Sequence, residues 1–199
     1  MGIVLPIQIN TSGSNSVATS HPGFNPEKFY TNTTANRSVL RSDGGYANNF
    51  YFSPIFLPKC NLTGIGCDIT DNSGIGKKLR MGIYTAKDGV PKDLIFSTGE
   101  IPVETNSEKI VTLEKSLPGG QYFTAYLASD TFRIASVHEN DCANTGYLIG
   151  VDLPGDKLPA GLRYEFPYGE MPQVFNPEDL TKKACTRSPL IFFRLSVNA

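Results

Sequence analysis

Hydrophobic residues alternate with polar or small residues in many short stretches of this 199-residue chain. In residues 61–69, hydrophobic side chains occupy every second position, at Ile65, Cys67 and Ile69. Residues 78–84 repeat this pattern. A period of two is typical of a β-strand that buries one face. Apolar residues do not recur at helical spacing over any stretch long enough for a helix, so the pattern predicts an all-β protein.

Turn residues divide the chain into about ten such segments. The strongest hairpin signal is Asp88-Gly89, and Pro118-Gly119-Gly120 forms a second turn. The other strand candidates are residues 49–57, 94–97, 101–103, 110–113, 121–129, 132–137, 146–151, 162–166 and 190–197. Short strands at a spacing of roughly ten residues predict an antiparallel β-sandwich, jelly-roll-like in type.

Two of these segments carry more specific expectations. Residues 121–129 are apolar or small on both faces, which predicts a central strand with the Tyr122 hydroxyl buried and hydrogen-bonded. Gly119 or Gly120 is expected at a turn position with positive φ just before this strand. Pro54 lies in the middle of residues 49–57, which predicts an edge strand or two shorter strands there.

Composition and charge exclude several classes of protein. Charged residues make up 19% of the chain, and the sequence is rich in Gly and Pro, which suits strands and tight turns. A formal net charge of −1 gives no attraction for nucleic acid or for an anionic membrane surface. No apolar run approaches the ~18 residues of a membrane span, and the first residues lack the basic region of a secretory signal. We therefore expect neither nucleic acid nor a membrane among the partners.

The first 36 residues differ from the rest of the chain. They contain two charged side chains, and residues 10–20 are mostly Thr, Ser, Asn and Gly. Such a segment cannot bury enough surface to fold alone. We expect residues 1–36 to form an extended arm that anchors the chain to another protein, the alternative being a mobile terminus. Residues 37–199 are expected to form one β-sandwich domain.

The cysteines do not suggest a metal site. Four cysteines allow three disulfide pairings, and none of their spacings is Cys-x-x-Cys. Both histidines lie far from the cysteines in sequence, so we expect no zinc and no other cofactor. Free, buried thiols are the favoured interpretation of Cys60, Cys67, Cys142 and Cys185.

Candidate catalytic residues are few. His138 lies in a polar stretch without a nucleophile motif nearby, and a solvated loop is the simpler interpretation. Glu165 and Glu170 are candidates for the carboxylate pair of a glycosidase, but no pattern places them across a groove. We expect that the protein is not an enzyme.

Several residues are candidates for a recognition surface. Asp71 and Asn72 lie in an oxygen-rich stretch that could hold calcium or form an Asx turn between strands. His138 is a third polar candidate. We expect recognition in the connections between strands, such as residues 68–76 and 138–145, because a rigid sandwich presents its loops.

Aromatic residues near the C-terminus form another candidate surface. Tyr164, Phe166 and Tyr168 could line a ligand-binding or subunit surface. The alternative is that Leu162, Tyr164 and Phe166 form the inward face of a strand.

One composite pattern is more specific than these. Residues 80–84 read Arg-Met-Gly-Ile-Tyr, residues 88–91 read Asp-Gly-Val-Pro, and residues 117–123 read Leu-Pro-Gly-Gly-Gln-Tyr-Phe. Together with residues 50–57 and 64–69, this pattern resembles a β-sandwich domain of tail-fibre and other virion proteins of tailed bacteriophages. The resemblance covers roughly residues 30–137. Its motifs are turn glycines, a turn proline and core aromatics, so it carries over no binding residues.

The resemblance implies a virion protein made in the host cytoplasm. One hypothesis is a tail-fibre or adhesin-type protein that presents its sandwich to a host-surface glycan. A second is a capsid decoration protein or short head fibre, anchored to the capsid by its N-terminal arm. A third, from another class, is a carbohydrate-binding, lectin-like module. For a virion protein we expect a homotrimer that contacts other virion proteins.

Overall fold

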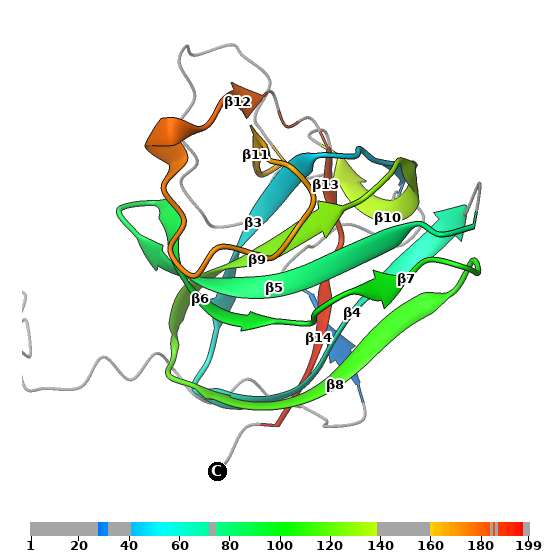
Figure 1. Cartoon of the computed structure of the whole chain (residues 1–199). Coiled ribbons are helices and arrows are strands. Elements are labelled where there is room, and N and C mark those ends of the chain that lie inside the picture. The colour runs from blue at the N-terminus through cyan, green and yellow to red at the C-terminus, as the bar shows by residue number, and fades with distance from the viewer. Residues whose placement is uncertain are drawn as a thin grey trace, which may run out of the picture.

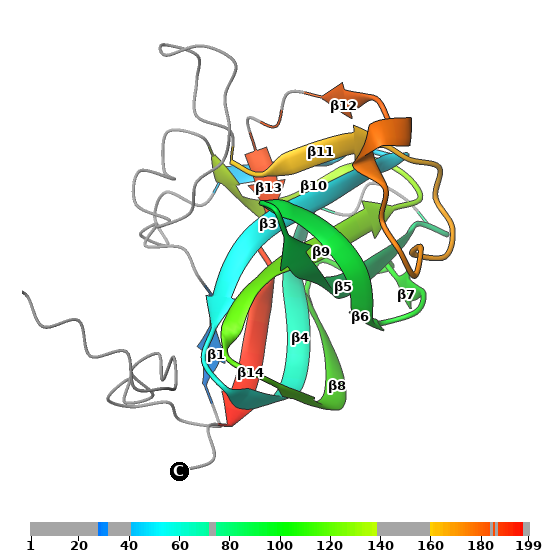
Figure 2. The ribbon, with the colours of Figure 1, turned by 90° about the vertical axis from the view of Figure 1, so that its left-hand side faces the viewer.

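The fold is taken from a computed structural model that describes residues 28–31, 41–71, 75–138, 160–183, 185 and 187–196. Side chains are described for all of these except residues 41–45, 138, 179 and 183. The described residues form two antiparallel sheets that pack face to face (Figure 1, Figure 2). They contain no helix apart from one short 3-10 turn. The prediction of an all-β sandwich is confirmed.

The described residues contain fourteen strands, more than the ten or so expected. They are β1 (Phe29–Tyr30), β2 (Arg41–Gly45), β3 (Asn49–Leu57), β4 (Cys60–Asp71), β5 (Lys78–Lys87), β6 (Val90–Ser97), β7 (Ile101–Pro102), β8 (Glu108–Leu117), β9 (Gly120–Ala128), β10 (Phe132–His138), β11 (Leu162–Glu165), β12 (Lys182–Lys183), β13 (Arg187–Pro189) and β14 (Phe192–Ser196). The 3-10 helix is η3 (Pro177–Asp179). β8 extends beyond the predicted residues 110–113 at both ends. The added residues include exposed charged side chains, which the hydrophobic pattern does not detect.

Eight of the strands follow the order of a jelly roll. β2, β10, β4 and β8 are successive neighbours in the first sheet. β3, β9, β5 and β6 are successive neighbours in the second. Counted from β2 along the chain and leaving out β7, the first sheet holds the first, eighth, third and sixth strands, and the second sheet holds the second, seventh, fourth and fifth. This is the jelly-roll order, in which the connections gather at the two ends of the sandwich.

The C-terminal strands complete the first sheet. β14 pairs with the first half of β4, whereas β10 pairs with the last residues of β4. β13, which precedes β14, pairs with β10. β13 and β14 therefore fill the space where β4 and β10 diverge. Ile191, Phe193 and Leu195 are buried, as their alternation predicts, and Val197 lies outside the described residues.

The main hydrophobic core lies between the two sheets. Its centre is formed by alternate side chains of β4 and β5, as predicted: Ile65, Cys67, Ile69, Leu79, Met81 and Ile83. Cys60 and Cys185 lie in the same core, and both are free thiols like Cys67. The expectation of free, buried cysteines is thus confirmed for these three, and Cys142 lies outside the described residues.

Strand β9 is central and is buried on both faces. It pairs with β3 along one edge and with β5 along the other. Tyr122 and Tyr126 belong to the main core, whereas Phe123 and Leu127 belong to a second core on the opposite face. The buried Tyr122 hydroxyl donates a hydrogen bond of 2.6 Å to the Pro118 carbonyl. The predictions of a central strand and a hydrogen-bonded tyrosine are confirmed.

The second core lies on the outer face of the second sheet. Residues 166–175, here called the strap, run over β5 to the edge of β6 and cover this face (orange segment after β11 in Figure 1). Phe175 of the strap is 1% exposed. Its ring centroid lies 4.5 Å from that of Phe52 and 5.2 Å from that of Tyr164. The strap therefore supplies the apolar cover that the outer face requires.

Close contact between the strap and β5 explains a glycine in that strand. A Cβ added at Gly82 would lie 2.7 Å from the Met171 sulfur and 2.8 Å from the Phe96 carbonyl oxygen. The Tyr84 hydroxyl, two residues further along β5, donates a hydrogen bond of 2.7 Å to the Pro172 carbonyl. The strap thus packs directly on the backbone of β5.

β3 is a single continuous strand, so the alternative of two shorter strands is wrong, and the alternative of an edge strand is correct only for its second half, which contains Pro54. It pairs with β9 along its whole length, and with β11 only from Asn49 to Phe52. Pro54 lies just beyond the end of β11. A proline has no N–H to donate, and it is tolerated at the point where the neighbouring strand has ended.

The turn before β9 differs from the prediction as well. The described glycines with positive φ do not include Gly119 or Gly120. Gly119 instead permits a close backbone approach, because an added Cβ would lie 3.1 Å from the Lys59 nitrogen. The hairpin between β5 and β6 does match its prediction: Asp88 and Gly89 have φ angles of 52° and 78°. Positive φ at both positions is the geometry of a type I′ turn.

The segment expected as an N-terminal arm contributes one strand. β1 pairs antiparallel with β14, and Tyr30 packs against the main core. Residues 1–27 and 32–40 lie outside the described residues, as do the strand candidate at 146–151 and the connection at 139–145.

Substitutions in β9 test its burial on both faces. Leu127→Asp should prevent folding, because it places an unpaired charge at a fully buried position, which costs about 3–5 kcal/mol. Ser129→Asp, at the half-buried end of the segment, should cost far less. Soluble expression and the melting temperature of the two variants measure the difference. Equal melting temperatures would contradict the placement of Leu127 in a core.

Candidate functional site

Four connections of the jelly roll meet at one end of the sandwich, here called the loop end. They join β2 to β3, β4 to β5, β6 to β8 and β9 to β10. The Val103 N–H donates to the Lys77 carbonyl at 2.8 Å, and the Lys78 N–H donates to the Ser129 hydroxyl at 2.8 Å. The Ala47 N–H donates to the Thr131 hydroxyl, in the β9–β10 turn, at 3.5 Å. Segments from both sheets are therefore held together at this end.

The strap begins at the same end. The Phe166 N–H donates to the Asn48 carbonyl at 3.0 Å, and the Tyr168 N–H donates to the Asn48 side-chain oxygen at 3.1 Å. Asn48 has a φ of 55°, a left-handed conformation that asparagine adopts more readily than most residues. These bonds fix the start of the strap to the β2–β3 turn.

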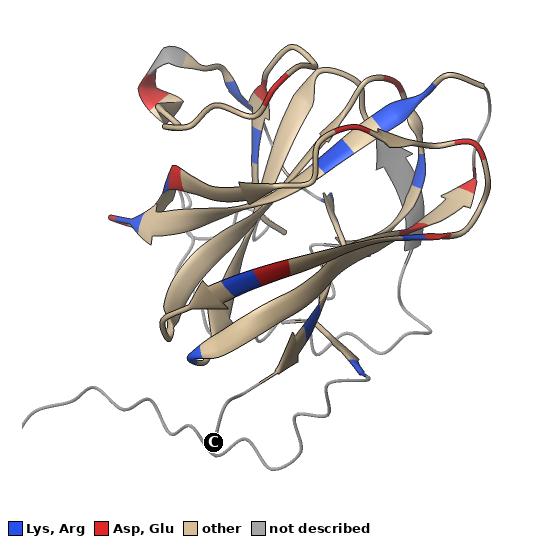
Figure 3. Cartoon of the chain, turned by 60° about the horizontal axis from the view of Figure 1, so that its bottom comes forward, with Lys and Arg blue, Asp and Glu red and all other residues tan. Residues whose placement is uncertain are grey.

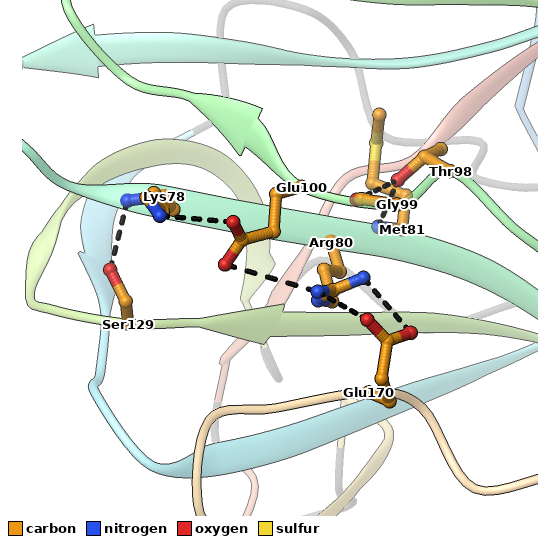
Figure 4. A network of polar contacts seen from close by, with 8 residues as sticks. All are labelled: Lys78, Arg80, Met81, Thr98, Gly99, Glu100, Ser129 and Glu170. Atoms are coloured by element: carbon orange, nitrogen blue, oxygen red, sulfur yellow. Dashed lines mark hydrogen bonds and ion pairs between the residues drawn. The ribbon is translucent and has the colours of Figure 1, made fainter.

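Arg80 is the one charged residue that is buried among the described residues. It lies on β5, on the face that the strap covers. Its terminal nitrogens donate to both carboxylate oxygens of Glu170, at 2.8 and 3.2 Å (Figure 4). The Glu100 carboxylate lies 3.8 Å from the same guanidinium, and the centroid of the Tyr168 ring lies 5.8 Å from its central carbon. Two parallel hydrogen bonds of this kind fix the orientation of the carboxylate.

Lys78 extends the polar network, and Lys77 forms a separate pair at the same end. The Lys78 ammonium donates to Glu100 at 2.9 Å (Figure 4). The Lys77 ammonium donates to the Thr131 carbonyl at 2.6 Å and lies 3.9 Å from the Asp130 carboxylate. Groups of opposite charge are thus paired across the loop end, and Figure 3 shows both signs interspersed over the described residues.

The network sets the protonation of two groups. A hydrogen bond from Lys78 is the main cause that lowers the pKa of Glu100, and attraction to Lys78 and Arg80 adds to it. Burial raises the pKa of Tyr168 to about 12, with a further contribution from the Glu100 charge. At neutral pH Glu100 is therefore ionised and Tyr168 carries its proton. The general acid of a glycosidase needs a raised carboxyl pKa, which is the opposite of the shift at Glu100.

The loop end presents its carboxylates to solvent and keeps two of its cations beneath them. The side chains of Arg80 and Lys77 are 8% and 11% exposed, whereas those of Glu170 and Asp130 are 83% and 59% exposed. A carboxylate has about four lone-pair sites, so acceptor capacity is left over for a ligand. Ile75, in the β4–β5 connection, is 98% exposed and adds an apolar side chain. The loop end can therefore accept hydrogen bonds and offer an apolar contact.

The structure separates the predicted aromatic candidates. Leu162 and Tyr164 are buried in the second core, so the alternative of an inward face is correct for them, and Tyr164 is not available on the surface. Phe166 is half-buried, and its ring centroid lies 5.2 Å from that of Phe50. Tyr168, also half-buried, is the predicted aromatic residue that reaches the polar network.

The predicted polar candidates lie at opposite ends of the sandwich. Asp71 ends β4 at the loop end, with its carboxylate 3.7 Å from the Arg133 guanidinium. The stretch from Asp68 to Asp71 continues β4 and is not a loop, whereas Asn72 lies outside the described residues. His138 ends β10 at the other end, and its side chain is not described. The structure therefore does not bring the predicted candidates together in one site.

The described part of the chain offers neither a metal site nor a membrane-spanning helix. No group of three or more His, Cys, Asp or Glu side chains there could hold a metal ion. No helix within it is long and apolar enough to cross a membrane.

Sequence reasoning did not predict Arg80 or Lys77 as site residues, although Arg80 opens the Arg-Met-Gly-Ile-Tyr stretch. Arg80 does have a local signal, because it is a single charge within the apolar stretch of residues 79–84. A charge on a strand that is buried on both faces needs a partner. That partner, Glu170, lies 90 residues later in a stretch without periodicity, so the pattern gives no sign of the pairing.

No protein-family model, curated protein or solved structure matches the chain.

The ion pair between Arg80 and Glu170 should respond unequally to removal of either partner. Glu170→Ala leaves a buried guanidinium without its main partner and should lower the free energy of unfolding by about 1–3 kcal/mol. Arg80→Met leaves an exposed carboxylate in solvent and replaces the buried charge by an apolar side chain, so it should cost about 1 kcal/mol or less. Urea denaturation measures both. An equal or reversed order would contradict the burial of Arg80.

The lowered pKa of Glu100 predicts a pH-dependent contribution to stability. A carboxyl whose pKa is lower in the folded state than in the unfolded state stabilises the fold above its ordinary pKa. That contribution is lost as the pH falls through the folded-state value. Glu100→Gln should therefore reduce stability at pH 7, and its difference from wild type should shrink towards pH 3. Glu114→Gln, on the exposed face of β8, is the control, and a constant difference for Glu100→Gln would contradict the prediction.

Proposed function

We propose that this chain is a structural protein of a bacteriophage virion, of the tail-fibre or adhesin type, that attaches to a glycan of the host surface. The resemblance over roughly residues 30–137 supports the virion assignment. The jelly-roll order of the strands adds support by analogy, because this fold recurs in viral capsid proteins and in lectin domains.

The observation that carries the proposal is the placement of β1 beside the first half of β4, whereas β4 ends at the loop end. β4 runs from Cys60 to the loop end, and β14 lies beside the first half of β4. β1 pairs with β14 level with Gly64 and Ile65 of β4, and it runs parallel to β4, towards the loop end. An anchor at one end and a set of recognition loops at the other are what an attachment protein needs.

The loop end favours binding over catalysis. Its carboxylates are held by cations, and the pKa of Glu100 is lowered. Under this proposal the partners are a host-surface glycan, other virion proteins and two further copies of the chain in a homotrimer. The protein would reside in the virion after synthesis in the host cytoplasm.

A capsid decoration protein, or a short head fibre, is the second candidate. The direction of β1 favours it equally, and under this candidate the expected N-terminal arm would hold the sandwich to a capsid. A lectin-like module outside a virion is a third candidate, which the loop end alone supports.

An electron-microscopy map of the intact particle, combined with binding of the purified chain to a glycan array, tests the proposal. Density at the tail and binding to bacterial surface glycans are expected. Density on the head would favour the decoration protein. Glycan binding without any virion density would favour the lectin-like module, and absence of both would overturn the proposal.

A further inference from the structure

The carboxylates of the loop end differ from ordinary surface carboxylates in how they are held. Glu170 receives two hydrogen bonds from a buried arginine, and Glu100 receives one from Lys78. Asp130 lies 3.9 Å from the largely buried Lys77. Glu170 and Glu100 are therefore oriented by cations of the protein before any ligand arrives, and Asp130 is oriented by the backbone N–H of Thr131. An oriented group loses little entropy on binding.

The charges of this network restrict the chemistry of its ligand. In the network, Lys78 and Arg80 oppose two carboxylates, so the network has no net charge. The separate pair of Lys77 and Asp130 is neutral as well. An anionic ligand would be repelled by the outward-facing carboxylates. A divalent cation would compete with ammonium and guanidinium groups for the same oxygens.

A hydroxyl group fits this surface best. It can donate to a carboxylate and accept from an ammonium group at the same time. Lys78 is half exposed and offers donors beside the acceptors of Glu100. Alternating donors and acceptors complement a ligand that carries several hydroxyls on neighbouring carbons. Such a ligand also has apolar C–H faces, for which the exposed Ile75 side chain provides a contact at the same end.

We infer that the loop end binds a neutral, hydroxyl-rich saccharide, with Glu170, Glu100 and Asp130 as acceptors, Lys78 as donor and Ile75 as the apolar contact. This inference rests on the proposed role in glycan attachment. It excludes acidic saccharides and metal-bridged binding as the principal mode. Tyr168 and Arg80 act as positioning residues, because they hold the strap and its carboxylate in place.

The test uses the full chain on an array that carries neutral, uronic-acid-containing and phosphorylated bacterial oligosaccharides. Wild type should bind neutral members and should not need added calcium. The double variant Glu170→Gln with Asp130→Asn should lose roughly tenfold in affinity for them, the effect of losing charge-assisted hydrogen bonds. Its melting curve is recorded alongside, since Glu170 also supports the fold.

Ile75→Ser is the second variant, and it is free of that complication because the side chain is almost fully exposed. It should weaken neutral-glycan binding several-fold without a change in melting temperature. Phe56→Ser is its matched control: Phe56 is 45% exposed near the end of β3, at the opposite end of the sandwich. This control should bind like wild type.

The outcomes separate the inference from the proposed function. Binding that survives both loop-end variants, or that is lost in Phe56→Ser alone, would overturn the loop end as the site and leave glycan attachment standing. A preference for acidic glycans, or a requirement for calcium, would overturn the proposed ligand class. Absence of binding to every glycan by the wild-type chain would overturn both the inference and the attachment role.

Discussion

The structure depends on the burial of the second sheet on both of its faces. A sandwich covers only the inner face of each sheet, yet β3, β5 and β9 carry aromatic and aliphatic side chains outward as well. Phe175 of the strap covers these outward side chains. It lies against the rings of Phe50, Phe52, Tyr84 and Tyr164. Burial of one such ring contributes about 1.5–3 kcal/mol, and without it the outer faces of its neighbours would also be in water. The course of residues 166–175 is therefore a consequence of the composition of the sheet.

Covering that face also protects an edge of the sandwich. The Leu94 N–H donates to the Gln173 carbonyl at 2.9 Å, and the Phe175 N–H donates to the Lys92 carbonyl at 2.7 Å, so the strap pairs with the free side of β6. The edge strand β8 of the first sheet is not covered by the strap but is protected by its charged residues. It carries Glu and Lys residues near both of its ends, and charge at an edge discourages pairing with another chain. One segment of the chain thus completes a core and closes an edge.

The local alternation of hydrophobic residues predicts the strands. The position of the strap, the edges of the sheets and the pairing of Arg80 depend on contacts between residues far apart in sequence. The period of two located β4, β5, β9 and β14, and two apolar faces correctly indicated a central strand in β9. The same pattern could not place Phe175, because it lies in an irregular stretch and its burial depends on residues more than a hundred positions earlier. Local propensity was misleading at Gly119, where a close backbone approach decides the conformation. At Pro54 it correctly indicated an edge, but it did not show that the strand continues through the proline. In the candidate site, Tyr168 has an aromatic signal, whereas the pairing of Arg80 with Glu170 has none.

The chemistry of the loop end follows from the same packing. Tyr168 and Glu170 belong to the strap, whose position is set a few residues later by Met171 on Gly82 and by Phe175 in the second core. Hydrogen bonds to water-exposed groups contribute only about 0.5–1.5 kcal/mol each, so a surface site gains affinity mainly when its groups are already oriented. Arg80 supplies that orientation because it cannot leave its carboxylate without exposing a buried charge to an apolar face. The stability of the second core and the geometry of the loop end are therefore coupled through one short segment.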